Sequence, residues 1–363
     1  MEQILRLLPH FRFEGDFRRM EELKSGNVNR TYRLTYDDGG VQRDYVLQRI
    51  NTYAFHDPER MMENIAGVTD HLRRALIARG ESPERRVLEV IRTTEDKPLY
   101  IDGEDVWRAY AFIGNAFAYD TVDPAAFYEV GRGFGNFQKL LIDYPAERLY
   151  ESIPDFHNTY KRFFQLMRAI DEDKAGRARE VKEEIEFFFD RRRMLWSIVE
   201  LIENGVLPLR VTHNDTKSNN VMLDRDSGKA ICVIDLDTVM PGSVLYDYGD
   251  AIRFGANAAA EDEPDTGRIA LDLSKARAFT EGFMAETNGF LTREELTRLP
   301  LGIKVLTGEL AMRFLTDYLD GDLYFKTAYP QHNLVRARAQ IALLRDIERK
   351  EDQLQALVDS LIG

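Results

Sequence analysis

The stretch that decides the fold is THNDTKSNNVML, residues 212–223, followed by KAICVIDLD, residues 229–237. Both contain short apolar runs, and the turn-forming sequence DRDSG separates them, which predicts two strands joined by a tight turn. Asn220 enters the first strand and Asp235 leaves the second, so we expect both side chains at the same edge of the hairpin. This strand-turn-strand unit interrupts a region of otherwise helical pattern.

The first stretch also carries residues suited to phosphoryl transfer, because His213, Asp215 and Asn220 form the arrangement H-x-D-x-x-x-x-N. Phosphoryl transfer needs a carboxylate that accepts the hydroxyl proton, oxygen ligands for magnesium and positive charge near the phosphates. We expect Asp215, at the tip of a loop, to be that base, and Asn220 and Asp235 to be the oxygen ligands. An aspartate in a loop is usually a turn former. The combination with Asp235 favours the catalytic interpretation.

Three neighbouring residues have alternative roles. Lys217 is either a point charge that reaches the γ-phosphate or an ordinary exposed lysine. We expect His213 to hold the loop through hydrogen bonds rather than bind a metal, because no second His or Cys lies nearby in the sequence. Asp237, two residues after Asp235, either binds a second metal or caps the next loop.

The N-terminal region predicts an antiparallel sheet with one helix. Pro58 follows the capping residue Asp57, and apolar residues recur at helical spacing from Met61 to Leu72. Aromatic and β-branched runs bounded by turn signals predict strands before and after this helix. The predicted strands are Glu21–Leu23, Thr31–Tyr36, Asp44–Ile50, Arg86–Arg92 and Val106–Ile113.

The pattern changes from strands to helices within Gly114–Asp123, where we place the boundary between two lobes, residues 1–114 and residues 115–363. The predicted helical regions run from Pro124 to about Gly205 and from about Leu271 onward, the last helix covering about Asn333–Leu361. The predicted fold class is therefore α+β: an N-terminal antiparallel sheet plus one helix, and a larger, mainly helical C-terminal lobe.

Charge and cysteine content exclude some partners. The 363 residues include 62 acidic and 49 basic side chains, a formal net charge of −13. Nucleic acids and anionic membranes repel such a chain at long range, so we expect neither as a partner. The single cysteine, Cys232, excludes an intramolecular disulfide and suits a reducing compartment. The first residues, MEQILRLLPHFRFEG, lack the pattern of a signal peptide, so we expect a soluble, cytoplasmic protein. The oligomeric state is not readable.

Five segments together resemble a known kinase superfamily. They are VLQRIN (Val46–Asn51), THNDTKSNN (Thr212–Asn220), VIDLDTVMPG (Val233–Gly242), YDYGDAIR (Tyr246–Arg253) and RFLTDYLDGDLYF (Arg313–Phe325). In combination they resemble the aminoglycoside phosphotransferase-like kinases, which share the two-lobed architecture of protein kinases. The closer resemblance is to the N-acetylhexosamine 1-kinases, which phosphorylate the anomeric hydroxyl of GlcNAc and GalNAc. It implies that residues 1–114 bind the nucleotide and that residues 115–363 form the catalytic and substrate-binding lobe.

Carried over by position, the resemblance implies roles for individual residues of the catalytic segment. It makes Asp215 the catalytic base and Asn220 and Asp235 the magnesium ligands, in agreement with the motif. It also implies that Asp247 and Asp250, in YDYGDAIR, are structural residues that brace the catalytic loop.

On the acceptor side, the resemblance places Asn214, Asp215 and Arg313 at the sugar. Arg313 lies among apolar residues of a predicted helix, where a charge commonly pairs with an acid one turn away. The alternative to a sugar contact is therefore an ion pair with Asp317 at i+4.

On the nucleotide side, we expect contacts from Asn29, Gln48, Arg49 and Lys217. Protein kinases hold the phosphates with a lysine on the third strand, whereas this strand has Gln48 at that place. Because alternate residues of a strand face opposite sides, either Arg49 bonds the phosphates or Gln48 offers a neutral hydrogen bond. Without that lysine, we do not expect the usual ion pair with a helix glutamate, and we expect Glu63 to be solvated.

The segment SGNVNRTY, Ser25–Tyr32, occupies the first hairpin turn, where kinases fold a loop over the phosphates. It has only one glycine, Gly26, so Asn27, Asn29 and Thr31 would have to bond the phosphates through side chains and backbone. The alternative is an ordinary hairpin turn.

These observations lead to one expected function and three alternatives. The expected function is an ATP- and Mg²⁺-dependent kinase that phosphorylates the C1 hydroxyl of an N-acetylhexosamine. The first alternative keeps the chemistry and changes the acceptor to another sugar, an aminoglycoside or an amino alcohol, since the motif does not specify the acceptor. The second is a nucleotide-binding pseudokinase without turnover, and the third is an adaptor that binds no nucleotide.

Overall fold

A computed structural model describes residues 2–23 and 29–362, and it divides the chain into two compact units. The sheet unit comprises Met1–Ala118, Asp143–Pro154 and Val221–Met240. The helical unit comprises Tyr119–Ile142, Asp155–Asn220 and Pro241–Gly363. The two-lobed α+β architecture expected from the sequence is confirmed. The lobe boundary between residues 114 and 115 stays a prediction. In the structure the chain first leaves the sheet unit after Ala118.

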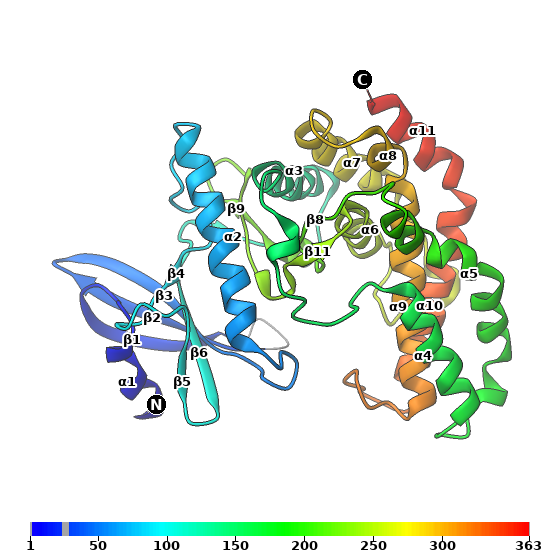
Figure 1. The fold of residues 1–363 in the computed structure, drawn as a ribbon, viewed down its shortest axis with the longest axis horizontal. Helices are drawn as coiled ribbons and strands as arrows, with labels where there is room; N and C mark the ends of the chain where they lie inside the picture. Colours follow the sequence, from blue (N-terminus) through cyan, green and yellow to red (C-terminus); the bar gives the residue numbers. More distant parts are fainter. Residues whose placement is uncertain (1, 24–28, 363) are drawn as a thin grey trace. The chain divides into compact units, whose positions relative to one another are not determined.

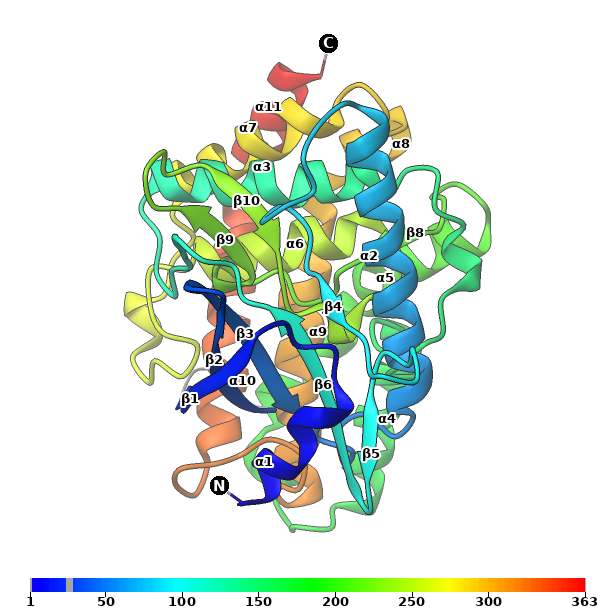
Figure 2. The same cartoon turned by 90° about the vertical axis from the view of Figure 1, so that its left-hand side faces the viewer.

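The sheet unit is built on one antiparallel sheet. Its strands differ in length and follow the order β1-β2-β3-β6-β4, with β5 paired to β6 (Figure 2). Its elements are α1 (Glu2–Leu7), β1 (Asp16–Leu23), β2 (Arg30–Asp38), β3 (Val41–Arg49), α2 (Pro58–Ala78), β4 (Val90–Ile91), β5 (Tyr100–Asp102) and β6 (Asp105–Ala111). The register places Gln48 of β3 opposite Arg108 of β6 and Arg49 opposite Trp107.

One face of this sheet is apolar and is covered by α1, which the sequence analysis did not predict. Leu34 and Leu47 are fully buried on neighbouring strands, and Ile4 and Leu7 of α1 belong to the same cluster. Burying these side chains removes apolar surface from water, which is the main stabilising term for a sheet of this size.

Helix α2 forms as predicted. The Asp57 carboxylate accepts a hydrogen bond from the Arg60 backbone N–H at 3.1 Å, and Pro58 occupies the first turn. Met61 and Leu72, at the ends of the predicted apolar stripe, are both buried.

The strand predicted over Arg86–Arg92 is wrong except for Val90–Ile91. Arg85 adopts a left-handed backbone with φ 60°, which bends the chain out of an extended path. Its guanidinium then donates to the carbonyls of Gly114 and Asn115 at 3.0 and 2.9 Å. A side-chain anchor from a neighbouring segment therefore overrides the local strand pattern.

The deciding stretch forms a second, three-stranded sheet in the order β10-β9-β7, also in the sheet unit. The strands are β7 (Ala116–Phe117), β9 (Val221–Asp224) and β10 (Ala230–Val233), and the short 3-10 helix η5 (Leu236–Thr238) follows β10. Asp224 closes the turn by accepting from the Ser227 backbone N–H at 2.9 Å, and Gly228 supplies φ 68°. The predicted hairpin is confirmed.

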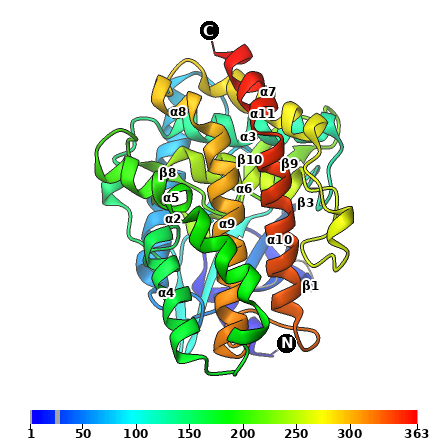
Figure 3. The same cartoon turned by 90° about the vertical axis from the view of Figure 1, so that its right-hand side faces the viewer.

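The helical unit surrounds the long helix α9 (Figures 1 and 3). Its elements are α3 (Pro124–Leu140), α4 (Thr159–Glu172), α5 (Lys182–Glu203), β8 (Arg210–Thr212), α6 (Val244–Gly255), α7 (Leu273–Thr287), α8 (Arg293–Thr297), α9 (Leu299–Asp320), α10 (His332–Arg349) and α11 (Glu351–Leu361), and the chain enters it for the last time within the short strand β11 (Met240–Gly242). Within the described residues, no helix has the length and hydropathy needed to cross a bilayer.

Helices α6 and α9 approach closely because each has a glycine at the contact. A Cβ on Gly249 would clash with the carbonyl group of Gly302, and a Cβ on Gly302 would clash with the carbonyl group of Leu245. This contact fixes α6, which carries Asp247 and Asp250, against the core of the unit.

The single C-terminal helix predicted over Asn333–Leu361 is two helices, α10 and α11, which meet at Lys350. The Lys350 ammonium donates to the Leu271 carbonyl at 2.7 Å and to the Asp346 carboxylate. The break therefore coincides with a side chain anchored outside its own helix.

Candidate active site

The 213–220 loop connects β8 to β9, and a buried carboxylate of α6 holds its first residues. Asp247 accepts hydrogen bonds from the backbone N–H of His213 at 2.9 Å and of Asn214 at 2.8 Å. A third donor is the Gln138 side-chain amide at 2.8 Å. Burial raises the pKa of Asp247, while nearby His213 and these hydrogen bonds act in the opposite direction. Asp247 thus has the bracing contacts that the resemblance implied.

Asp250, one turn later on α6, holds the middle of the same loop. It accepts from the Thr216 backbone N–H at 3.0 Å, and the Thr216 hydroxyl donates to the Asp247 carbonyl at 2.7 Å. Arg253 donates to the other Asp250 oxygen at 2.7 Å. Burial alone would raise the pKa of Asp250, but the Arg253 charge and hydrogen bonds, together with Lys217, lower it.

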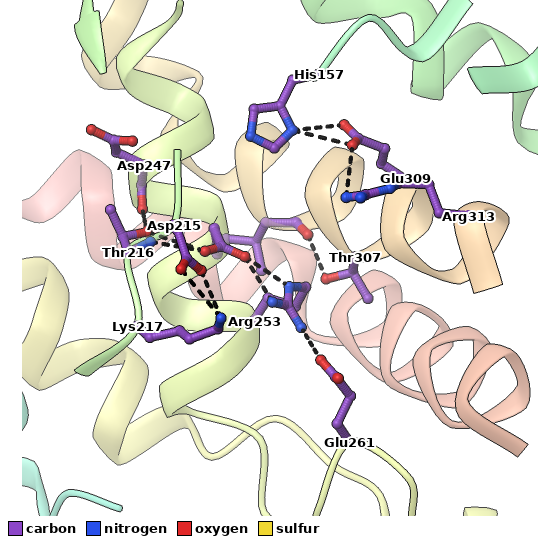
Figure 4. Close-up of polar contacts among 12 residues, drawn as sticks. His157, Asp215, Thr216, Lys217, Asp247, Arg253, Glu261, Thr307, Glu309 and Arg313 are labelled. Atoms are coloured by element: carbon purple, nitrogen blue, oxygen red, sulfur yellow. Dashed lines mark hydrogen bonds and ion pairs between the residues drawn. The ribbon is translucent and has the colours of Figure 1, made fainter. Parts of the chain in front are cut away.

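Asp215 lies between these two anchored points with its carboxylate partly open to solvent. The Lys217 ammonium lies 2.9 Å from one carboxylate oxygen of Asp215 and 3.2 Å from the other. The Asp215 side chain is 28% exposed and that of Lys217 is 40% exposed. Burial lowers the pKa of Lys217, but the Asp215 charge and hydrogen bond outweigh it and the pKa is raised. The pair therefore presents a carboxylate and a protonated amine side by side (Figure 4).

His213 and Asn214 turn their side chains toward the protein. The His213 ring is fully buried and packs edge-on against Phe134, with ring centroids 5.5 Å apart. Asn214 has φ 64° and donates from its side chain to the Thr212 carbonyl at 3.3 Å. The structure thus gives Asn214 a contact within the loop, and its assignment to the sugar stays a prediction.

Asn220 and Asp235 have the chemistry of magnesium ligands. Asn220 closes the loop by donating its amide N–H to the Asp215 carbonyl at 2.8 Å, which directs the other half of the amide, its oxygen, away from that bond. Asp235 follows β10 with φ 60°. Within residues 2–23 and 29–362, no three or more His, Cys, Asp or Glu side chains gather as a metal cage. A magnesium ion held by one or two protein oxygens together with substrate phosphates needs no such cage. Asn220 belongs to the helical unit and Asp235 to the sheet unit.

In the sheet unit, Asp237 is occupied by protein donors. Both of its carboxylate oxygens accept from the guanidinium of Arg108, and Asn29 adds a side-chain N–H at 2.9 Å. Asn29 in turn accepts from the Asn51 backbone N–H at 3.0 Å. These contacts favour a structural role for Asp237 over the binding of a second metal. It anchors its segment by an ion pair, however, and not by the loop cap that the sequence suggested.

Gln48 and Arg49 face opposite sides of the sheet, as strand alternation requires. Gln48 donates to the Thr31 hydroxyl at 3.0 Å and accepts from Arg108 at 2.9 Å. The Arg49 guanidinium lies 2.5 Å from the Asp105 carboxylate and is 43% exposed. The predicted phosphate contact, by either Arg49 or Gln48, stays a prediction.

Part of the turn predicted to cover the phosphates lies outside the described residues. Gly26 and Asn27 lie outside the described residues, whereas Thr31 begins the buried part of β2. The sequence analysis also missed Arg108. A signal was present, since this arginine is a charge in the middle of the apolar strand VWRAYA.

A second polar group of the helical unit surrounds Glu309, which is almost fully buried in α9. His157 lies 3.0 Å from the Glu309 carboxylate, and Arg313 lies 3.9 Å from it (Figure 4). Burial would raise the pKa of Glu309, but His157, Arg313 and Arg162 lower it. The pairing of Arg313 expected with Asp317 is wrong: its acid is Glu309, one turn earlier.

Asp317 is unavailable to Arg313 because backbone groups occupy it. It accepts from the N–H groups of Leu323, Tyr324 and Phe325 at 2.9, 2.8 and 2.9 Å. The Arg313 guanidinium is instead surrounded by rings, with Phe156, Tyr324 and Phe325 centroids 5.2, 5.9 and 5.6 Å away. Such cation–π contacts orient the guanidinium without neutralising it.

Comparison with known proteins gives one family and several similar folds. A model described as the phosphotransferase enzyme family matches residues 19–285. A spectinomycin phosphotransferase in complex with ADP and spectinomycin is 14% identical, with a TM-score of 0.56, covering 97% of this chain and 98% of that one. An ethanolamine kinase from Plasmodium vivax is 14% identical, with a TM-score of 0.56 and coverage of 89% and 82%. A choline kinase from Cryptosporidium parvum is 12% identical, with a TM-score of 0.54 and coverage of 95% and 93%. At these identities the likeness shows the fold.

Proposed function

Because the chain belongs to the phosphotransferase enzyme family, we propose that it is an ATP- and Mg²⁺-dependent kinase that phosphorylates the C1 hydroxyl of an N-acetylhexosamine. The observation that carries the phosphotransfer part is the 213–220 loop, in which Asp215 is held by its neighbours while its carboxylate stays partly exposed. A base that is rigid in backbone and open at its reactive oxygens suits proton abstraction from a bound hydroxyl.

In the proposed reaction, Asp215 accepts the proton of the acceptor hydroxyl as the oxygen forms a bond to the γ-phosphorus of ATP. The bond from that phosphorus to the β–γ bridging oxygen breaks, and ADP leaves. Lys217 places its positive charge beside Asp215 and near the transferred group, where negative charge is spread over the phosphoryl oxygens. We assign Asn220 and Asp235 as the residues that would hold magnesium, which would supply positive charge to offset that of the phosphates.

The choice of a neutral sugar over a cationic acceptor rests on the charges around Arg313. Burial lowers the pKa of Arg162, and the positive charge of nearby Arg313 lowers it further. Two guanidinium groups and the His157 ring share one buried carboxylate, Glu309. The guanidinium groups of Arg162 and Arg313 would repel the polyamine of an aminoglycoside or the ammonium of an amino alcohol.

The same group of side chains offers what an N-acetylhexosamine needs. Guanidinium N–H groups donate to acetamido and hydroxyl oxygens, and the exposed ring of Tyr324 offers a flat apolar face for a sugar ring. The resemblance through RFLTDYLDGDLYF supports the same acceptor class.

An acceptor panel tests the proposal. ADP release with Mg²⁺ and ATP is measured for GlcNAc, GalNAc, other hexoses, spectinomycin, choline and ethanolamine. We expect turnover with GlcNAc or GalNAc and little with the cations. Turnover with a cation only would retain the kinase chemistry and reject the sugar. No turnover with any acceptor, together with an ATP-induced thermal shift, would support the pseudokinase alternative.

A further inference from the structure

The centre of the sheet unit holds a buried ion pair that the proposed reaction does not use directly. Arg108 lies in β6 and is 1% exposed, and Asp237 is 4% exposed. Each nitrogen of the guanidinium donates to a protein side chain: one to Gln48 and two to the carboxylate of Asp237. Two parallel N–H···O bonds fix both the distance and the orientation of the carboxylate.

This arrangement argues against Arg108 as a ligand of the nucleotide phosphates. The third strand of a kinase would present a phosphate-binding lysine at Gln48, and Arg108 lies directly opposite that position in the sheet. Its guanidinium, however, is buried and already engaged with Gln48 and Asp237. A group without solvent access cannot reach a phosphate unless these contacts break.

Arg108 binds Asp237, which lies in the same segment as Asp235, two residues later. Besides the ion pair, the Ser152 hydroxyl donates to the Asp237 carbonyl at 3.0 Å, and the Asn64 side chain donates to the Val239 carbonyl at 3.1 Å. Asn29 adds its bond to the Asp237 carboxylate. Residues 237–239 are therefore fixed by side chains from four separate parts of the sheet unit.

Asp235 has a left-handed backbone. Its φ of 60° and ψ of 58° lie in a region that Asp enters more readily than most residues with a Cβ, although at a cost relative to the right-handed regions. The charge of Asp235 is also near enough to contribute to raising the pKa of Arg108. The ion pair also lies only two residues along the chain from Asp235.

From this convergence we infer that the Arg108–Asp237 pair is a positioning device that holds Asp235 in its left-handed conformation and so sets the affinity of the protein for the divalent cation. The inference rests on the proposed function, in which Asp235 is a magnesium ligand. Arg108 acts through Asp235 and touches neither the nucleotide nor the acceptor. Outer partners that orient metal ligands commonly change metal affinity by about 10- to 100-fold when removed.

The test measures Mn²⁺ affinity by electron paramagnetic resonance in the presence of a non-hydrolysable ATP analogue, so that no turnover is needed. The double variant Arg108→Met/Asp237→Asn removes both buried charges together and avoids leaving one unpaired. We expect it to fold and to bind Mn²⁺ about 10- to 100-fold more weakly than the wild type. A folded double variant with wild-type Mn²⁺ affinity would overturn the inference.

A matched control and a conservative variant complete the design. Arg33 and Asp44 form another ion pair between strands of the same sheet, at 2.7 Å. The variant Arg33→Met/Asp44→Asn should leave Mn²⁺ affinity unchanged. If the Arg108 double variant does not fold, Arg108→Lys keeps the charge but loses the two-pronged grip. It should bind Mn²⁺ several-fold more weakly, and unchanged affinity in this variant would also overturn the inference.

A cycle with Asp235→Asn separates failure of the inference from failure of the proposed function. If the pair acts through Asp235, its removal should cause no further loss of Mn²⁺ affinity once Asp235 is Asn, so the two effects should not add. Additive effects would contradict that route. If Asp235→Asn itself leaves Mn²⁺ affinity unchanged, Asp235 is not the metal ligand that the proposed function assigns, and the inference loses its premise, whereas the acceptor panel still tests the kinase activity.

Discussion

The two units hold their proposed reactive aspartates by different means. In the helical unit, Asp247 and Asp250 accept backbone N–H groups of the 213–220 loop, so the loop is fixed while Asp215 stays partly exposed. In the sheet unit, an ion pair between side chains, Arg108 and Asp237, fixes the segment after β10. Backbone hydrogen bonds fix the course of a loop, whereas a two-pronged ion pair fixes one carboxylate. The proposed base, Asp215, and the proposed metal ligand Asp235 are thus held by different sets of contacts, whereas the second proposed ligand, Asn220, shares the loop of the base.

The largest expected effect comes from removing the reactive oxygen of the helical unit while leaving its brace intact. Asp215→Asn should lower kcat by roughly 10²- to 10⁴-fold, because a positioned base contributes about that much. Thermal stability and nucleotide binding should be retained. The measurement is steady-state kinetics with a thermal shift on the same sample, and Asp352→Asn, an exposed position of α11, is the control. Full activity in Asp215→Asn would remove its assigned role.

The second prediction breaks the brace itself. Asp247→Ala leaves three buried donors, from His213, Asn214 and Gln138, without their acceptor. We expect a loss of about 3 kcal/mol or more in the free energy of unfolding, since each such donor costs roughly 1–3 kcal/mol. Urea unfolding measures it. For comparison, Asp272→Ala removes an ordinary helix cap of α7 and should cost about 1 kcal/mol. Equal losses in the two variants would argue against a special role for Asp247.

The third prediction sharpens the contrast on the sheet side. Asn64 accepts from the Tyr150 backbone N–H at 2.9 Å and donates to the carbonyls of Tyr150 and Val239. Asn64→Ala should cost about 2 kcal/mol of unfolding free energy, less than Asp247→Ala, because its bonds are neutral. Urea unfolding of both variants at one pH compares them. A larger loss for Asn64→Ala would reverse the ranking.

The fourth prediction concerns Lys217, whose alternatives were a phosphate contact and an exposed lysine. Lys217→Met removes a charge-assisted contact worth about 1.5–3 kcal/mol, so kcat/KM for ATP should fall by roughly 10- to 100-fold. Stability should hardly change, because ion pairs this exposed contribute little. The measurement is kcat/KM for ATP of Lys217→Met. The control is Lys229→Met, which changes a lysine in the β9–β10 hairpin of the sheet unit. Unchanged kinetics in both variants would leave Lys217 as an ordinary lysine.

The smallest effect is a difference in pH dependence between the two bracing carboxylates. The pKa of Asp250 is lowered in the folded protein, so its contribution to stability is present above the unfolded pKa of about 3.9 and is lost as pH falls through the folded value. The stability deficit of Asp250→Asn should therefore shrink between pH 7 and pH 3. The pKa of Asp247 is raised, so the deficit of Asp247→Asn should not shrink over that range. Parallel pH profiles from chemical unfolding would contradict the opposite shifts.

Much of the fold could be predicted because its signals are local. The α2 helix has its cap, proline and apolar stripe within fifteen or so residues, and the β9–β10 hairpin has its turn between two apolar runs. The same holds for Asp215 and Asn220, which share one loop, and for the bracing residues of YDYGDAIR. Patterns on this scale are what single-sequence reasoning detects.

The rest depends on contacts between distant residues. Arg108 and Asp237 lie 129 positions apart, so no spacing rule connects them. The strand predicted over Arg86–Arg92 was displaced by the Arg85 anchor, and the C-terminal helix was interrupted where Lys350 reaches Leu271. Arg313 was assigned the wrong acid because three backbone N–H groups had already occupied Asp317. In the first three cases the deciding contact joins residues far apart in the sequence, and for Arg313 it comes from the segment that follows its helix.

The central claim is transfer of the γ-phosphoryl group of ATP to the C1 oxygen of an N-acetylhexosamine, and phosphorus NMR of the product tests it most directly. The protein is incubated with MgATP and GlcNAc, and the product resonance is examined for coupling to the anomeric proton. The account predicts a sugar 1-phosphate whose phosphorus couples to H1, formed by the wild type and almost absent with Asp215→Asn. A phosphate on another hydroxyl, or equal product from both proteins, would contradict it.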